Sequence, residues 1–74
     1  MILHQNILGV DVAKDWIDIC DLATGQVRRI DTTRRALAAF AASLPADALV
    51  VFEASGGYER PLMAALEDAS CAYA

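Results

Sequence analysis

The sequence predicts an α/β fold built on one mixed sheet, with the element order β-β-β-α-β-α and the start of a further strand. Residues 7–12 and 48–52 are almost entirely apolar, as expected for strands inside a sheet. Residues 16–22 alternate between apolar and polar side chains, which is typical of a strand with one buried face. Two further segments repeat their apolar residues at helical spacing. Strands and helices that follow one another in this way favour an α/β domain.

The first three strands are expected to form an antiparallel meander. Residues 7–12 form a strand that we expect to be buried on both faces. A turn at residues 13–15 leads into the half-buried strand 16–22, and residues 23–25 have turn chemistry. Residues 26–30 can therefore return as the third strand.

Two helices and a parallel strand are expected after the meander. Residues 31–33 supply candidate N-caps for an amphipathic helix that Pro45 ends. Residues 48–52 then form a buried parallel strand, a second helix follows Tyr58, and the apolar stretch from Ser70 begins another strand. The apolar residues at helical spacing are Leu37, Phe40, Ala41 and Leu44 in the first helix, and Leu62, Ala65, Leu66 and Ala69 in the second. This order predicts a mixed sheet with helices on its faces.

The composition describes an ordered domain that is too small for a large catalytic architecture. Of the 74 residues 57% are hydrophobic and 22% are charged, unlike a disordered segment. Cys20 and Cys71 have no close-spaced partner, which argues against a zinc motif or a disulfide framework. No run approaches the roughly 20 apolar residues of a membrane span, and the start of the chain, where His4 is expected to be exposed, lacks signal-peptide features. We therefore expect a cytoplasmic protein without a membrane partner.

Two strands that should be buried each carry one carboxylate, Asp11 within the first strand and Glu53 directly after the fourth. Burying an unpaired carboxylate costs several kcal/mol, so such a group needs a cation, a proton or strong donors. Neighbouring strands lie about 4.8 Å apart, which would let the two side chains converge at one end of the sheet. Convergent carboxylates bind Mg²⁺ and serve phosphoryl transfer on nucleic acid. In the alternative interpretation, each carboxylate caps a backbone group or pairs with an arginine.

A second set of residues consists of candidates for binding nucleic acid. Ser55, Gly56 and Gly57 form a turn before a helix, and free N–H groups there could receive a phosphate. Tyr58 could stack on a base, and Lys14 could approach a phosphate. The alternative roles are a plain turn, a cover for the edge of the core and a solvated lysine.

The basic residues near the third strand could also contact a phosphate backbone. They are Arg28, Arg29, Arg34 and Arg35. The alternative is a solvated edge of a strand and a helix, and the net charge of -4 argues against DNA binding by this chain alone.

Two sequence blocks resemble a known family of enzymes. Residues 9–14, GVDVAK, and residues 52–59, FEASGGYE, look like the two signature blocks of the DEDD-type insertion-sequence transposases. This family includes the Piv-type DNA invertase and recombinases guided by a bridging RNA. The resemblance covers essentially the whole chain and implies a RuvC-like ribonuclease H fold, truncated here. It also implies four acidic metal ligands in the order Asp, Glu, Asp, Asp, of which Asp11 matches the first and Glu53 the second.

The resemblance further implies the role of the chain and its partners. Residues 1–74 would be the N-terminal part of a ribonuclease H-like catalytic domain, and the rest of that domain and a C-terminal domain are expected downstream. The full-length protein would cut and transfer DNA strands with Mg²⁺ or Mn²⁺, in some members with a guide RNA. With half of the expected ligands, this part of the domain would bind the metal incompletely and be inactive alone.

Two other classes of protein stay open. The actin-like ATPases also begin with an aspartate-bearing strand and a three-stranded meander, but their first turn offers small hydroxyl or glycine residues to phosphate. This chain has Val12, Ala13 and Lys14 at that place. The second class is a catalytically silent module that pairs with another copy through an open sheet edge, and we expect a homo-oligomer on this ground.

Overall fold

The computed structural model describes residues 6–74, so the expectation for His4 lies outside the described residues. The elements are β1 (Asn6–Val12), β2 (Trp16–Asp21), β3 (Val27–Asp31), α1 (Arg34–Ala42), β4 (Ala48–Phe52), α2 (Arg60–Asp68) and β5 (Ala72–Tyr73). This order of elements confirms the predicted succession of a meander, a helix, a strand, a second helix and a final strand.

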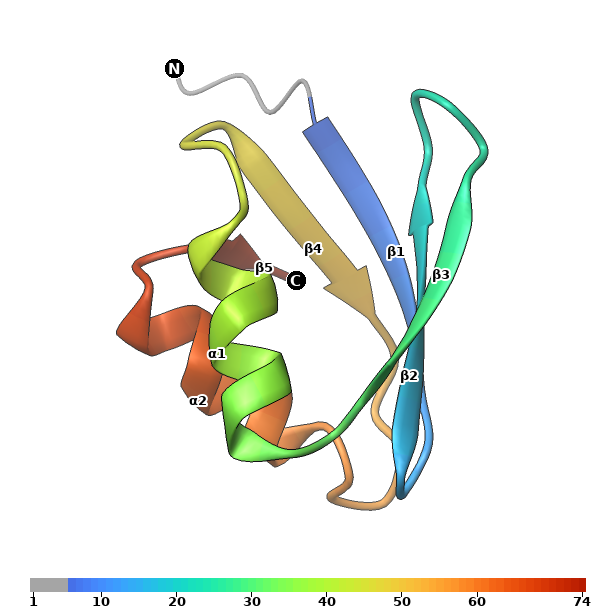
Figure 1. Ribbon diagram of the computed structural model, residues 1–74, viewed down its shortest axis with the longest axis vertical. Helices are drawn as coiled ribbons and strands as arrows, with labels where there is room; N and C mark the ends of the chain where they lie inside the picture. Colours follow the sequence, from blue (N-terminus) through green and yellow to red (C-terminus); the bar gives the residue numbers. More distant parts are fainter. Residues whose placement is uncertain (1–5) are drawn as a thin grey trace.

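The five strands form one mixed sheet in the order β3-β2-β1-β4-β5 (Figure 1). β1 and β2 are antiparallel, as are β2 and β3, which confirms the meander. After the α1 crossover, β4 runs parallel to β1, and β5 runs parallel to β4. The chain therefore has the predicted α/β fold, and β1 and β4 form a parallel pair inside the sheet.

Local sequence signals explain where the helices begin and end. The hydroxyl of Thr33 accepts a hydrogen bond from the N–H of Ala36 at 3.2 Å, which makes Thr33 the N-cap of α1. α1 ends at Ala42, before Pro45. Pro61 lies in the first turn of α2, where its missing N–H removes no intrahelical hydrogen bond. Neither helix is long and apolar enough to cross a bilayer.

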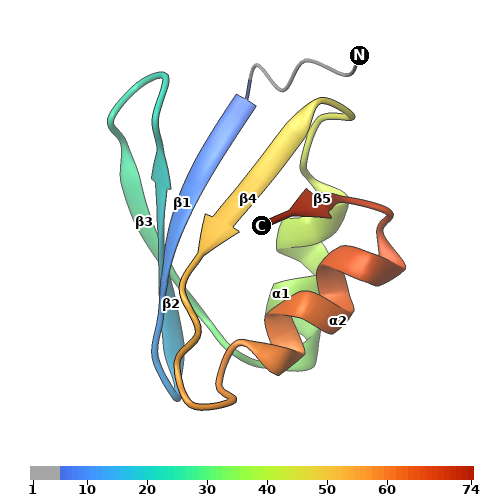
Figure 2. The ribbon, with the colours of Figure 1, turned by 180° about the vertical axis from the view of Figure 1, so that it is seen from behind.

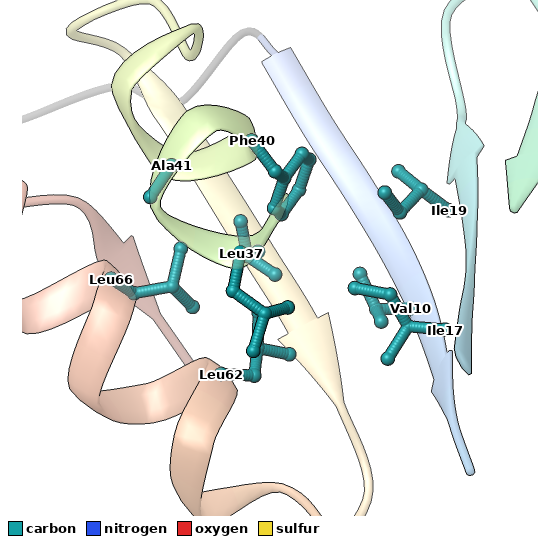
Figure 3. Packing of buried hydrophobic residues seen from close by; sticks show 9 residues of the cluster. Val10, Ile17, Ile19, Leu37, Phe40, Ala41, Leu62 and Leu66 are labelled. Atoms are coloured by element: carbon teal, nitrogen blue, oxygen red, sulfur yellow. The ribbon is translucent and has the colours of Figure 1, made fainter. Parts of the chain in front are cut away.

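The core lies between the sheet and the two helices (Figure 3). Alternate residues of β1, β2 and β4 point towards α1 and α2 and are buried against them. The buried cluster consists of Val10, Ile17, Ile19, Leu37, Phe40, Ala41, Val50, Leu62 and Leu66. The two helices therefore supply five of these nine residues, all at positions that recur with helical spacing.

Both helices cover the same face of the sheet, and none of the described elements covers the other face (Figures 1 and 2). The expected helices therefore lie on one face of the sheet only, and the expectation that residues 7–12 are buried on both faces is wrong. Residues 48–52 form the expected parallel strand, with Ala48 and Val50 buried on its covered side. Asp11 on β1 is exposed, and Val51 on β4 is 40% exposed. Apolar runs indicate strands within a sheet, but they do not reveal which face the crossover helices cover. The uncovered side is called the open face below.

Candidate metal centre and nucleic-acid interface

Asp11 and Glu53 lie beside each other at the carboxyl ends of β1 and β4. The last pair in the parallel register joins Val10 to Phe52, and the two acids are the next residues on their chains. Because Val10 points into the core, Asp11 points to the open face. Both acids line one hollow of about 480 Å³ on that face. The structure therefore brings the two predicted ligands together.

Asp11 and Glu53 are both exposed. Burial therefore does not force either residue to hold a cation, since water can solvate both carboxylates. Their role as candidate metal ligands is inferred instead from their positions, because two acids on adjacent parallel strands share one face and one end of the sheet. The nearest alternative, a pairing of either acid with an arginine, does not occur among residues 6–74.

A third carboxylate, Asp18 on β2, stands opposite Asp11 in the antiparallel register and lines the same hollow. It accepts two hydrogen bonds from the guanidinium of Arg29, at 2.8 Å from Nε and 3.1 Å from Nη2. This hydrogen bonding and the charge of Arg29 hold the pKa of Asp18 below its ordinary value. Sequence reasoning missed Asp18, although counting back from the turn at residues 13–15 pairs it with Asp11.

Arg28 and Arg29 both have partners inside the sheet. The guanidinium carbon of Arg29 lies 3.8 Å from the ring centre of Trp16, and its hydrogen bonds to Asp18 raise the pKa of Arg29. Arg28 points to the helix side, where its guanidinium lies 5.6 Å from the ring centre of Phe40. Neither arginine is therefore merely a solvated side chain at the edge of the sheet.

The carboxylate of Glu59 lies against the turn at residues 55–57 and accepts hydrogen bonds from it. Gly56 and Gly57 have φ angles of 72° and 105°, which favour glycine. The carboxylate of Glu59 accepts hydrogen bonds from the N–H of Gly57 at 2.9 Å and from the hydroxyl of Ser55 at 3.2 Å. Glu59's own N–H, with the groups of Ser55 and Gly57, lowers the pKa of Glu59. The expected free N–H of Gly57 is therefore occupied.

The remaining predicted contacts with nucleic acid lie on the surface. Lys14 is exposed in the turn between β1 and β2, and Arg34 and Arg35 are exposed in the first turn of α1. Tyr58 is 50% exposed before α2, so it leaves much of its ring accessible instead of covering the core. Sequence reasoning overlooked Arg60, which opens α2, and Glu59, which follows the two glycines at a distance that allows it to fold back.

Asp11 and Glu53 supply two carboxylates to the site, which is fewer ligands than a divalent cation requires for a complete coordination shell. Within residues 6–74, no three His, Cys, Asp or Glu side chains come close enough together to hold a metal ion. Mg²⁺, however, is commonly held by one or two carboxylates, with water and substrate phosphates completing its shell. Asp11 and Glu53 fit a partial site of this kind. Both cysteines are free thiols, and burial raises the pKa of Cys71.

No family model and no curated protein matches this chain. The sheet order β3-β2-β1-β4-β5 with two helices is compatible with a ribonuclease H-like core.

Proposed function

We propose that the chain is the N-terminal part of a RuvC-like ribonuclease H catalytic domain from a DNA transposase or site-specific recombinase. The observation that carries this proposal is the adjacency of Asp11 and Glu53 on the open face, at the carboxyl ends of β1 and β4. The same two residues match the acidic positions of the two resemblance blocks. Sequence and geometry thus support the same pair by separate arguments.

Asp11 and Glu53 would together hold Mg²⁺ or Mn²⁺ against a phosphate of the DNA strand. A divalent ion at such a site supplies charge stabilisation for the oxygens of a phosphodiester. Because both carboxylates are exposed, a phosphate can reach them without any movement of the sheet. Asp18 remains paired with Arg29, whereas within residues 6–74 neither Asp11 nor Glu53 has an arginine partner.

Binding of Mn²⁺ to the chain tests this proposal. Asp11→Asn and Glu53→Gln are each expected to weaken binding at least about tenfold, or about 1.4 kcal/mol, because each removes one of two charged ligands. Asp68→Asn is the matched control, since it makes the same change of charge at an exposed position at the end of α2. The affinity can be measured by titration with electron paramagnetic resonance of free Mn²⁺.

Equal Mn²⁺ affinities in the unmodified chain and in all three variants would refute the proposed metal site. Binding of ATP without any affinity for nucleic acid would support the actin-like alternative instead. DNA cleavage is not expected from the 74 residues alone, so metal binding is the more direct readout.

The open face also supports a second candidate function, a module that associates with a copy of itself. Val27 is 64% exposed and Val51 is 40% exposed, and both line the hollow that contains Asp11. Exposed apolar side chains on an uncovered sheet face are a common feature of association surfaces. This candidate explains the apolar part of the face but assigns no role to the two acids.

A further inference from the structure

The open face carries two rows of residues that run across the neighbouring strands β3, β2, β1 and β4. Residues two apart on a strand share a face, and the strand register places each of them level with its neighbours. The apolar row consists of Val27, Cys20, Gly9 and Val51. The charged row consists of Arg29, Asp18, Asp11 and Glu53.

The apolar row is high at its two ends and low in the middle. Val27 and Val51 stand at the ends and are 64% and 40% exposed. Gly9 has no side chain, and a Cβ atom added there would meet no atom within 4 Å. The half-buried thiol of Cys20 lies beside it, and all four residues line the hollow of about 480 Å³. The row therefore has two apolar projections and a central space.

The charged row has opposite charges at its two ends, Arg29 on β3 and Glu53 after β4. The side chain of Arg29 is 58% exposed and uses Nε and Nη2 for its hydrogen bonds to Asp18. A guanidinium has five N–H donors, so Arg29 retains donors for a second carboxylate. One end of the row can thus bind a group like the one at its other end.

This arrangement makes the open face complementary in charge to a second copy of itself. Two facing sheets can be related by a two-fold axis that lies between them and runs parallel to the strands. Such an axis reverses the order of the strands and keeps positions along them, so that β3 of one copy faces β4 of the other when the axis lies between β1 and β2. Arg29 then faces Glu53 of the second copy at both ends of the charged row.

The same operation makes the apolar rows complementary in shape. Val27 faces Val51 of the second copy, and Cys20 faces Gly9 of the second copy, where the absent side chain leaves room for the thiol. Sheets that stack face to face lie about 10 Å apart, with strand directions within about 30° of each other. Two-fold dimers of this kind are the commonest symmetric assemblies.

We propose that the open face docks on the open face of a second copy in this two-fold sandwich, and that the sandwich closes the candidate metal centre. The inference rests on the second candidate function, self-association, and specifies its geometry and its effect on the metal site. Arg29 of the second copy takes the space beside Glu53 that a phosphate would need. The sandwich is therefore a closed state that must open before the proposed metal centre can bind DNA.

Carboxylates on the two copies oppose the sandwich in part. Asp11 faces Asp18 of the second copy, although Arg29 offsets the charge of Asp18 within its own chain. Each chain also has a net charge of -4. Salt screens this repulsion, and the Debye length is about 8 Å at physiological ionic strength. Association is therefore measured at that ionic strength or above.

Disulfide trapping tests the geometry of the sandwich. Val27→Cys and Val51→Cys are made separately in a chain whose own thiols, Cys20 and Cys71, are replaced by alanine. The oxidised mixture of the two variants is expected to form a cross-linked heterodimer, whereas each variant alone should form little cross-linked product. Ala64→Cys mixed with Val27→Cys is the control, since Ala64 is exposed on the covered side. Non-reducing gel electrophoresis measures the products.

A charge reversal tests the pairing of Arg29 with Glu53 of the second copy. Glu53→Arg is expected to weaken dimerisation at least about tenfold, because it places two guanidinium groups opposite each other at both ends of the charged row. Asp68→Arg is the matched control, since it makes the same change of charge at an exposed position on α2. Light scattering over a range of concentrations gives the dimerisation constants, and circular dichroism checks that both variants fold.

The cross-linked heterodimer also tests the closure of the metal centre. It is expected to bind Mn²⁺ at least about tenfold more weakly than the Val27→Cys variant does at a concentration where that variant is monomeric. Equal Mn²⁺ affinities in the two samples would overturn the closure.

The sandwich and the functions on which it rests fail in different ways. A monomer at every concentration overturns both self-association and the sandwich. A dimer in which either cysteine variant cross-links alone as readily as the mixture, or in which Glu53→Arg and Asp68→Arg dimerise equally, overturns only the sandwich. If the heterodimer forms while Asp11→Asn leaves the Mn²⁺ affinity of the monomer unchanged, the sandwich geometry is supported and the metal site is refuted.

Discussion

On the open face, Asp11 has a carboxylate on each side, Glu53 on β4 and Asp18 on β2. Arg29 engages only one of them, Asp18, through two hydrogen bonds. The guanidinium carbon of Arg29 also lies 3.8 Å from the ring centre of Trp16, and this cation–π contact adds to the pairing with Asp18 in holding the side chain in place. Within residues 6–74, the two like-charged neighbours Asp11 and Glu53 have no arginine, which is the condition under which an added cation is most favourable.

The pairing of Asp18 with Arg29 predicts a pH dependence of stability. Because the folded state lowers the pKa of Asp18 from 3.8, the contribution of the pair is present above that value and is lost as pH falls through the lowered pKa. Asp18→Asn should therefore slightly lower the melting temperature at neutral pH and have no effect in strong acid.

Circular dichroism melting over a pH series measures this effect. The controls are Arg29→Gln and the double variant, since the double variant should lose little beyond either single change if the two residues act as a pair. A difference between Asp18→Asn and the unmodified chain that stays the same at every pH would contradict the assignment.

The helices α1 and α2 supply the apolar layer that holds the sheet on its covered face. Leu37 and Phe40 from α1 meet Leu62 and Leu66 from α2 over β1, β2 and β4 (Figure 3). Since the open face has no such layer among the described residues, this single core must stabilise the chain. A small domain with one core has a limited margin of stability.

Leu66→Ala is expected to lower the free energy of unfolding by about 2–5 kcal/mol, because Leu66 is fully buried and its removal leaves a cavity among packed side chains. Val27→Ala is the control, since Val27 is 64% exposed and its truncation should have only a small effect. Urea unfolding followed by circular dichroism gives both values. Similar decreases in the two variants would contradict the one-sided core.

At the scale of the whole molecule, the sheet divides the chain into a covered side and an open side (Figure 2). The open side combines the exposed apolar residues Val27 and Val51 with the acids at one end. Under the proposed function the acidic end of this face would hold a divalent metal ion, whereas its exposed apolar part is suited to contact with another apolar surface.

We expect the chain to associate with itself through the open face at high concentration. Val51→Lys should shift the equilibrium towards monomer, because it places a charge within the apolar part of that face. Ala64→Lys is the matched control, since Ala64 is exposed on α2, on the covered side. Size-exclusion chromatography with light scattering over a range of concentrations measures the effect. A monomer at every concentration would contradict the expectation.

Much of the fold and part of the candidate site could be predicted from local patterns. Alternation in β2, helical spacing in α1 and α2, and the cap at Thr33 act over a few residues, so they can be recognised along the chain. The parallel pairing of β1 with β4, and hence the meeting of Asp11 with Glu53, follows from the meander and the α1 crossover.

Other features depend on contacts between segments that lie far apart along the chain. The sequence contains no signal for the face of the sheet on which both helices pack. Because they pack on the face opposite Asp11, this carboxylate is exposed and does not need a cation to offset the cost of burial. Nor does it reveal that Glu59 occupies the glycine turn, or that Arg29 pairs with Asp18 while Arg34 has no carboxylate partner within residues 6–74. Propensity and periodicity act between neighbours in the chain, whereas burial and charge pairing are settled by which surfaces meet once the chain has folded.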